Sequence, residues 1–497
     1  MTPKATLTYS VIAAFALVAL FFAVGPLMAL GALASLLVAL AIWFWPTVGV
    51  VLMIVTGVGI PHLAAANSYI PISITQVVAL LTIGSGAYSV WAHREQFTYA
   101  PHFIAIVAFL AIVMASTLLK PDMEQSRIGA STYLRAAMFV GVVACLAIRR
   151  SSFMTAALSL TAAVTLCSVL GVAEYAVPGF HIPSADDEQY ERTGAAVSTF
   201  SMEDDSDTIV RVSGGTGNYN WLAYTIAVGL PLNLFWWRYA KSSLAKFIVV
   251  AATVAQFAAL VLTYTRSGFI GLAAAVVFLI WQRRLPLWIP AAIIGVAALT
   301  SPLWMPQRFL DRVFSTKYLA QGTTTIRKDF AYAGWDMFLQ APIFGHGYGQ
   351  FGPFFMAHSK SIYVPPLRDE IEKGAGTEND IRPHNLYVDL ACDYGIIGLG
   401  AFAAFVVLLY LDLSAVRAAA ASPTDADLAL LMQSALIAFC VSGFFGNIAI
   451  MKIPWVLSGL AAALRRVAFT APSAPNLTEF EPRGLANRFG ASIAWKS

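Results

Sequence analysis

The amino-acid sequence predicts an all-α, polytopic membrane protein with about twelve to fourteen transmembrane helices and one large, partly helical outer loop. Of its 497 residues, 58% are hydrophobic and only 12% are charged, and the mean hydropathy is +0.70. Soluble proteins carry about 25% charged residues, so this chain has too few polar side chains to cover a water-exposed surface. The net charge of +4 is small and dispersed, which gives no case for nucleic-acid binding.

Apolar stretches long enough to cross a bilayer, about 20 residues each, recur along the whole chain. The third and the last stretch are short, so twelve or thirteen spans are also compatible with the sequence. No small-residue cleavage site follows the first stretch, which predicts a retained helix in place of a cleaved signal. The fourteen predicted spans lie near 9–24, 27–45, 47–60, 71–90, 102–118, 131–148, 153–177, 220–237, 247–264, 267–281, 286–303, 385–411, 428–447 and 452–464.

Basic residues in short loops predict the orientation of these spans. With this count they fall on one side, which is predicted to be cytoplasmic and to hold both termini. The basic residues concerned are Lys4, Arg94, Arg149, Arg150, Arg238, Lys241, Lys246, Arg283, Arg284, Arg417, Arg465 and Arg466. The predicted division is N-terminal spans 1–177, acidic outer loop 178–219, central spans 220–303, large outer loop 304–384, C-terminal spans 385–466 and cytoplasmic tail 467–497.

Two long loops lie on the predicted outer face. In the second, Ile326, Phe330, Met337 and Phe338 recur at helical spacing, which predicts an amphipathic helix on the membrane surface that ends before Pro342. The first loop lacks the spacing of a calcium loop, so we expect a solvated acidic segment of open role and no metal site. Its acidic residues are Asp186, Asp187, Glu188, Glu191, Glu203, Asp204, Asp205 and Asp207.

Arg266 is the most informative of the cations on this face. It lies in a tight hairpin, 263–268, between two apolar helices, and no acidic residue occurs within ten positions. A guanidinium group binds a diphosphate bidentately and stays charged at every relevant pH, so Arg266 is a candidate anion site. The alternative is an arginine that extends to the membrane interface without binding a ligand.

Two further arginines are weaker candidates. Arg327 begins the predicted amphipathic helix, where it either binds an anion or pairs with Asp329 in solvent. Arg211 precedes a glycine-rich, donor-rich stretch, 213–218, that ends at Asn218. Such backbone can approach a phosphate closely, but an ordinary loop has the same composition, so both readings stay open.

His384 lies where the large loop re-enters the membrane. A neutral imidazole there could accept the proton of a sugar hydroxyl, and the amides of the following helix would disfavour its charged form. Asn385 marks the helix entry, and Asp389 and Asp393 lie on one helical face, where they could bind sugar hydroxyls. The alternative is a loop histidine satisfied by a carbonyl group.

Glycines and cysteines add less. The run Gly345–Gly349 follows no predicted strand, so turn formation explains it better than phosphate binding. Cys145, Cys167, Cys392 and Cys440 all fall in apolar stretches and are predicted to be buried thiols, not disulfides or metal ligands.

His384-Asn385, nine further residues and then Gly395-x-x-Gly398 resemble the histidine motif of the O-antigen ligase and O-antigen polymerase superfamily. Thr265–Gly268 is similar to the family's arginine hairpin, and Arg327 followed by 342–351 is similar to its arginine and P-x-x-G-x-G loop. The segment 217–223 is also similar, although Tyr219 replaces the usual proline. The resemblance covers about 200–460.

The resemblance implies a polytopic inner-membrane enzyme that transfers a glycan, with inversion and without metal or cofactor, at the periplasmic face. The donor would be an undecaprenyl-diphosphate-linked glycan, and the acceptor lipid A-core, a second lipid-linked glycan or a protein hydroxyl. His384 would be the base, and Arg266 and Arg327 would bind the leaving diphosphate. Arg211, Asn218, Asn385 and Asp389 remain candidates for substrate binding.

Three alternatives stay open. A ligase is slightly favoured over an O-antigen or exopolysaccharide polymerase because two arginines precede the histidine. A secondary transporter for an anion would need such residues near the middle of the bilayer, on broken helices, but here they lie at span ends. A non-catalytic envelope partner would leave the ordered motifs unexplained.

Overall fold

The computed structural model describes residues 26–61, 73–93, 99–119, 123–147, 150–180, 182, 211–292, 295, 299, 323–372 and 377–470. The secondary structure in these ranges is helical, and they contain no strand, which confirms the all-α prediction. The predicted span 9–24, the acidic residues 186–207, half of 286–303 and most of the tail lie outside the described residues.

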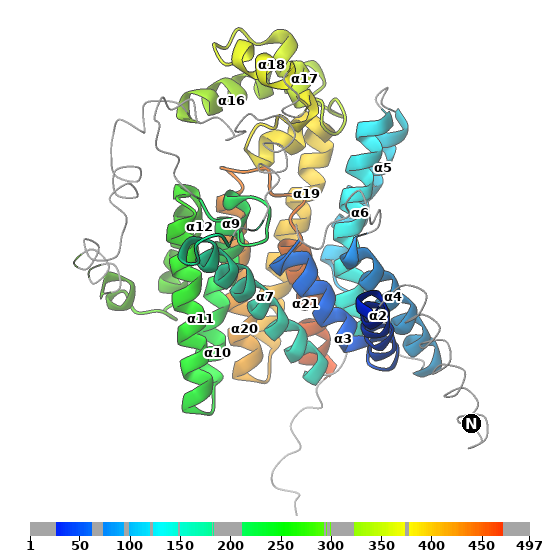
Figure 1. Cartoon of the computed structure of the whole chain (residues 1–497), viewed down its shortest axis with the longest axis vertical. Coiled ribbons are helices and arrows are strands. Elements are labelled where there is room, and N and C mark those ends of the chain that lie inside the picture. The colour runs from blue at the N-terminus through cyan, green and yellow to red at the C-terminus, as the bar shows by residue number, and fades with distance from the viewer. Residues whose placement is uncertain are drawn as a thin grey trace, which may run out of the picture.

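Figure 1 shows the arrangement of the helices in the described ranges, which fall into three groups along the chain. The first group is α2 (Pro26–Phe44), α3 (Pro46–Ile54), η1 (Val55–Gly59), α4 (Ile74–His93), α5 (His102–Leu119), α6 (Met123–Leu146) and α7 (Arg150–Ala176). The second group is α9 (Tyr219–Gly229), η2 (Leu230–Leu232), α10 (Asn233–Tyr239), α11 (Ser243–Leu262) and α12 (Arg266–Trp281). The third is α16 (Thr323–Gln340), α17 (Phe351–His358), α18 (Val364–Glu372), η3 (Glu378–Asp380), α19 (Leu386–Ala419), α20 (Pro423–Ser442) and α21 (Ile453–Thr470).

The chain is a multi-pass membrane protein. Among the described residues, six helices are long and apolar enough to cross a bilayer: α5, α6, α7, α11, α19 and α20. A seventh span results if the pair 34–44 and 46–59, bent by 118° at Trp45 and Pro46, counts as one. Helices occupy each predicted span from 27–45 to 267–281 and from 385–411 to 452–464. The full count of twelve to fourteen stays a prediction, and so does the division of the chain into segments.

Helix α19 lies at the centre of the bundle, where it packs against α5, α20 and α21 (Figure 1). Large aromatic side chains fill the contact: Trp455 stacks on Phe405 with ring centroids 5.4 Å apart, and Phe109 meets Phe402 at 5.5 Å. These rings are almost fully buried. A bundle held by such contacts gives fixed positions to the polar groups at its two ends.

One end of the bundle carries paired charges from loops that are far apart in sequence. Asp427 of α20 binds Arg238 at 3.0 Å and Arg284 at 3.1 Å, and Asp425 binds Arg150 at 2.8 Å. The prediction that the loops holding these three arginines share one side is therefore confirmed. We call this the basal end, and the end at which α16, α17 and α18 lie the loop end (top of Figure 1).

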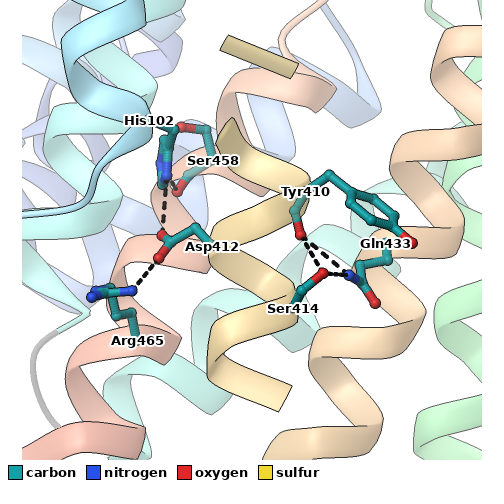
Figure 2. A network of polar contacts seen from close by, with 7 residues as sticks. All are labelled: His102, Tyr410, Asp412, Ser414, Gln433, Ser458 and Arg465. Carbon is teal, nitrogen blue, oxygen red and sulfur yellow. Dashed lines mark hydrogen bonds and ion pairs between the residues drawn. The ribbon is translucent and has the colours of Figure 1, made fainter. Parts of the chain in front are cut away.

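A second polar network ties α5, α19 and α21 together inside the bundle (Figure 2). The Asp412 carboxylate binds His102 Nδ1 at 3.1 Å and the Arg465 guanidinium, and the other ring nitrogen of His102 lies 3.3 Å from the Ser458 carbonyl oxygen. His102 and Asp412 are buried. Because an unpaired charge in a membrane span is costly, the pairing allows these side chains to be buried and fixes the three helices.

The described part of the large loop forms a small helical subdomain, α16–α18, with its own apolar core. Phe330 contacts Phe351 and Phe355 with ring centroids 5.5 and 4.8 Å apart. The helix predicted around Ile326, Phe330 and Met337 is confirmed, but these side chains are buried inside the subdomain. The prediction that they face the membrane surface is wrong, because α17 and α18 cover them; the opposite face of α16 is exposed.

The run Pro342–Gly349 closes a break in α19. Gly395 has φ 65° and ψ −167°, which interrupts the helix and leaves backbone groups without helical partners. The loop supplies partners: the amides of His346 and Gly347 donate to the carbonyl oxygens of Cys392 and Asp393, at 2.8 and 2.9 Å. The Ile396 amide donates to the Pro342 carbonyl oxygen at 2.8 Å. Turn formation, as predicted, explains the glycine run, and it joins the two most recognisable motifs.

Replacing Gly395 by alanine is expected to destabilise the protein and loosen this junction. The added Cβ would lie 2.2 Å from the Ile343 carbonyl oxygen, and the backbone conformation is accessible almost only to glycine. The backbone strain alone should cost about 1–3 kcal/mol, measurable as a lower thermal unfolding midpoint in detergent. Gly400→Ala in the same helix, where nothing lies within 4 Å, is the control and should not destabilise. Equal thermal unfolding midpoints for the two variants would refute the claim that the contact between this loop and α19 requires glycine at position 395.

Candidate functional site

His384 lies at the loop end, directly before α19. The Asn385 side chain caps that helix by accepting from the amides of Tyr387 and Val388, at 2.9 and 3.2 Å. His384 itself has φ 50°, a left-handed conformation that is rare for a residue with a side chain and often marks functional sites. Its ring stacks on Phe330, with centroids 6.1 Å apart. It makes no hydrogen bond to another described residue, so the predicted alternative of a carbonyl-satisfied histidine does not hold within the described residues.

The surroundings of His384 favour the neutral imidazole. Burial and, as the smaller cause, the positive charge of Arg327 together lower its pKa to about 4. Both effects disfavour the protonated ring. The imidazole is therefore uncharged at neutral pH and has a lone pair available to accept a proton.

Arg327, in the second turn of α16, is close enough to His384 for its charge to act on the ring. It lies three residues before Phe330, on the same face of the helix as the ring that stacks on His384. The alternative was a solvated charge paired with Asp329 or nearby acids. Among the described residues Arg327 and Asp329 form no salt bridge, and Asp329 accepts a hydrogen bond from Ser361; the rest of that alternative stays a prediction. Gly334 allows α16 to lie close to α19, because a Cβ at this position would lie 2.4 Å from the Val388 side chain.

Tyr224 of α9 lies between the separate cationic segments. Its hydroxyl lies 3.0 Å from Ser267 Oγ, in the arginine hairpin, and donates to the Phe445 carbonyl oxygen at 3.0 Å. Arg327 and Arg211 are both close enough to act electrostatically on this hydroxyl. The hairpin of Arg266, the start of α16 and Arg211 therefore meet near one tyrosine, although they are far apart in the sequence.

Arg211 holds the hairpin that carries Arg266. Its Nε donates to the Thr263 carbonyl oxygen at 2.9 Å, and its Nη2 donates to Thr265 Oγ1 at 3.0 Å. The guanidinium group also stacks on the Tyr219 ring, 3.2 Å from the centroid. The hairpin is strained at Tyr264, which has φ 53°. These contacts position the first turn of α12, where Arg266 begins the helix.

The backbone amides of the donor-rich stretch after Arg211 already bind a carboxylate of the protein itself. The Glu174 carboxylate accepts from the amides of Ser213 and Gly214, at 2.8 and 2.9 Å. Asn218 caps α9 by accepting from the amides of Asn220 and Trp221. The described contacts of this stretch are thus structural, and the predicted role of Asn218 in substrate binding stays a prediction.

Asp389 and Asp393 bind a cation that the sequence reading did not single out. Arg382 Nη1 lies 3.2 Å from Asp389 and 3.1 Å from Asp393, and its guanidinium group stacks on Tyr348, 4.1 Å from the centroid. Asp393 also accepts from the Gly349 amide at 3.2 Å. This network fixes the glycine loop to α19. A contribution of Asp389 to substrate binding stays a prediction.

A comparison with known protein families gives one match. A family model described as O-antigen ligase matches residues 251–403. This chain carries an O-antigen ligase family domain. The match confirms the resemblance to the O-antigen ligase and polymerase superfamily that the motifs indicated, and it supports a glycosyltransferase-like enzyme. No curated protein matches the chain.

The matched segment contains the three candidates for catalysis, Arg266, Arg327 and His384, and also Asn385 and Asp389. Arg211, Asn218 and Tyr224 precede it, although the described contacts place Arg211 and Tyr224 beside the hairpin. Sequence reasoning missed Tyr224 and Arg382. A lone tyrosine in an apolar helix gives a weak signal, and Arg382 lies in the loop before α19, so helical spacing does not link it to Asp389.

Proposed function

We propose that this protein transfers a glycan from an undecaprenyl-diphosphate carrier to an acceptor hydroxyl at the periplasmic face of the bacterial inner membrane, as an O-antigen ligase does. The observation that carries the proposal is that Arg327 is close enough to act electrostatically on both His384 and the Tyr224 hydroxyl, which lies 3.0 Å from Ser267 in the hairpin of Arg266. A base and fixed cations are the groups that glycosyl transfer from a diphosphate requires.

The proposed reaction is a single displacement at the anomeric carbon. His384 accepts the proton of the acceptor hydroxyl while the oxygen of that hydroxyl forms the new glycosidic bond to the anomeric carbon. The bond between the anomeric carbon and the diphosphate oxygen breaks, and its electron pair goes to that oxygen. Attack from the side opposite the leaving group inverts the anomeric configuration.

Arg266 and Arg327 have complementary roles in this proposal. Their guanidinium groups bind the diphosphate and stabilise the negative charge that develops on it as it leaves. Arg211 is a positioning residue, because its two hydrogen bonds go to Thr263 and Thr265 in the Arg266 hairpin. A bound diphosphate would also offset the Arg327 charge and thereby raise the pKa of His384, so that the base strengthens when the donor is present.

The pH dependence of the rate tests this link. Because the folded protein holds the pKa of His384 at about 4, kcat/KM is expected to stay constant as the pH falls from about 8 to about 5 and to decline as the ring protonates near pH 4. In the donor complex the decline in kcat should begin at a higher pH. An ordinary histidine would instead give a break near 6.5 in kcat/KM, and that result would contradict the buried, cation-flanked site.

Complementation separates ligase from polymerase activity. The gene is expressed in one strain that lacks its O-antigen ligase and in another that lacks its polymerase, and the glycan ladders are compared. Restored long chains on lipid A-core in the first strain support the ligase proposal. Restored chain extension in the second strain alone would replace it with a polymerase, and restoration in neither would count against both activities for these substrates.

A further inference from the structure

Two cations outside the site described above lie between α6 and α21. Arg135 is on an exposed face of α6, and Lys452 is half-buried directly before α21. The two helices pack against each other with the Tyr133 and Trp455 rings 6.4 Å apart, so Arg135 and Lys452 lie close enough to act electrostatically on each other. Neither side chain forms an ion pair with a residue in the part of the chain that the structure describes. Two neighbouring like charges repel each other unless an anion lies between them.

Arg135 is directed toward the loop end. Its Nε donates to the Ser131 carbonyl oxygen at 3.0 Å, and its Nη2 donates to Thr132 Oγ1 at 3.2 Å, both one turn nearer the start of α6. That part of α6 touches the glycine loop, since a Cβ on Gly129 would lie 2.5 Å from the Tyr348 ring. The cation pair therefore faces the same end of the bundle as His384.

The position of the pair along the helices is costly without a ligand. Arg135 lies within the apolar span Glu124–Leu146, at the level of the start of α21 and beside the exposed side chain of Leu134. Lys452 lies at the start of α21, where its carbonyl oxygen accepts from the Val456 amide at 2.9 Å. A cation at a helix N-terminus is disfavoured by the helix dipole, whereas an anion there is stabilised. Charged groups inside membrane spans are by default candidates for function.

We propose that Arg135 and Lys452 bind the phosphate group of a membrane lipid that enters between α6 and α21 from the leaflet at the loop end. A guanidinium fork and an ammonium group suit the oxygens of a phosphate, and basic pockets between membrane helices bind lipid headgroups. The exposed apolar side chains of Ile128 and Leu134 flank Arg135 and would lie against the acyl or prenyl chain.

This lipid site is separate from the arginines near His384. Arg266 belongs to α12, which packs against α9 and α20, whereas Arg135 belongs to α6, which packs against α5 and α21. In Figure 1, α12 and α6 lie on opposite sides of α19. The protein would therefore bind two phosphate-bearing lipids at once, one on each side of the central helix.

Native mass spectrometry of the full-length protein with undecaprenyl phosphate counts the bound lipids. Arg135→Gln and Lys452→Gln should each weaken one binding event by roughly ten- to a hundredfold, since each removes a charged hydrogen-bond partner. Binding of the second lipid, at the site of Arg266 and Arg327, should be unchanged. Lys246→Gln, at an exposed lysine on α11, is the matched control and should bind both lipids as the parent does.

Equal binding by the parent and both variants would overturn the proposal. Displacement of the lipid by an equal concentration of inorganic pyrophosphate would show a site for a free anion and would also overturn it. Retained binding after Arg266→Gln supports two separate sites. Because binding is measured without transfer, failure of this proposal and failure of the proposed enzymatic function are distinguishable.

Discussion

Replacing His384 by alanine is expected to lower the rate of glycan transfer by about 100- to 10,000-fold. The variant removes the only proposed base, and the ring contact with Phe330 offers no group that could take over proton transfer. Binding of the donor should change little, because the diphosphate is assigned to the arginines. The measurement is the initial rate of transfer by purified enzyme in detergent, with donor affinity determined separately.

His358→Ala is the control for this prediction. His358 is exposed at the end of α17, in the same subdomain, and its ring stacks on Phe354. This variant should transfer glycan at the parental rate, and both variants should show similar thermal unfolding. A His384→Ala enzyme that keeps more than about a tenth of the parental rate would remove the general-base role.

Replacing Arg327 or Arg266 by glutamine is expected to lower the rate by about 100- to 1,000-fold each, or about 2.7–4 kcal/mol of barrier. Each variant removes one fixed positive charge from the diphosphate while keeping a side chain of similar length. Arg327→Gln should also raise the pKa of His384, because the charge that lowers it is gone. The acid limb of the pH–rate profile should then move to higher pH, which a merely structural role would not produce.

Two variants serve as comparisons for the arginine prediction. Arg368→Gln, at an exposed position on α18, should leave the rate unchanged. Arg327→Lys keeps the charge but loses the bidentate fork, so its rate should lie between those of the parent and Arg327→Gln. An Arg327→Gln enzyme with normal rate and an unshifted pH profile would exclude this residue from diphosphate stabilisation.

The membrane helices could be predicted from the sequence because hydropathy is a local property. Each apolar stretch must satisfy its own backbone hydrogen bonds in lipid, so a run of about 20 apolar residues predicts a helix without knowledge of its neighbours. The hairpin before α12 followed from the same reasoning. The site candidates Arg266, Arg327 and His384 came from residue types with a high cost of burial and from motif order, and their catalytic roles await experiment.

Long-range contacts could not be read from the sequence. The stretch that ends at Asn218 shows this. Its composition allowed a phosphate-binding loop, but the carboxylate of Glu174, almost 40 residues earlier in the chain, already accepts hydrogen bonds from the amides of Ser213 and Gly214. The apolar face of α16 was likewise assigned to the membrane, because nothing local shows that α17 and α18 cover it. Tyr224 matters only because three segments converge on it.

A cryo-electron-microscopy structure of the enzyme with a non-hydrolysable undecaprenyl-diphosphate sugar tests the central claim most directly. We expect Arg266 and Arg327 both to lie within hydrogen-bonding distance of the diphosphate oxygens, with the anomeric carbon facing the His384 imidazole. A diphosphate bound only elsewhere, with His384 remote from the sugar, would contradict it.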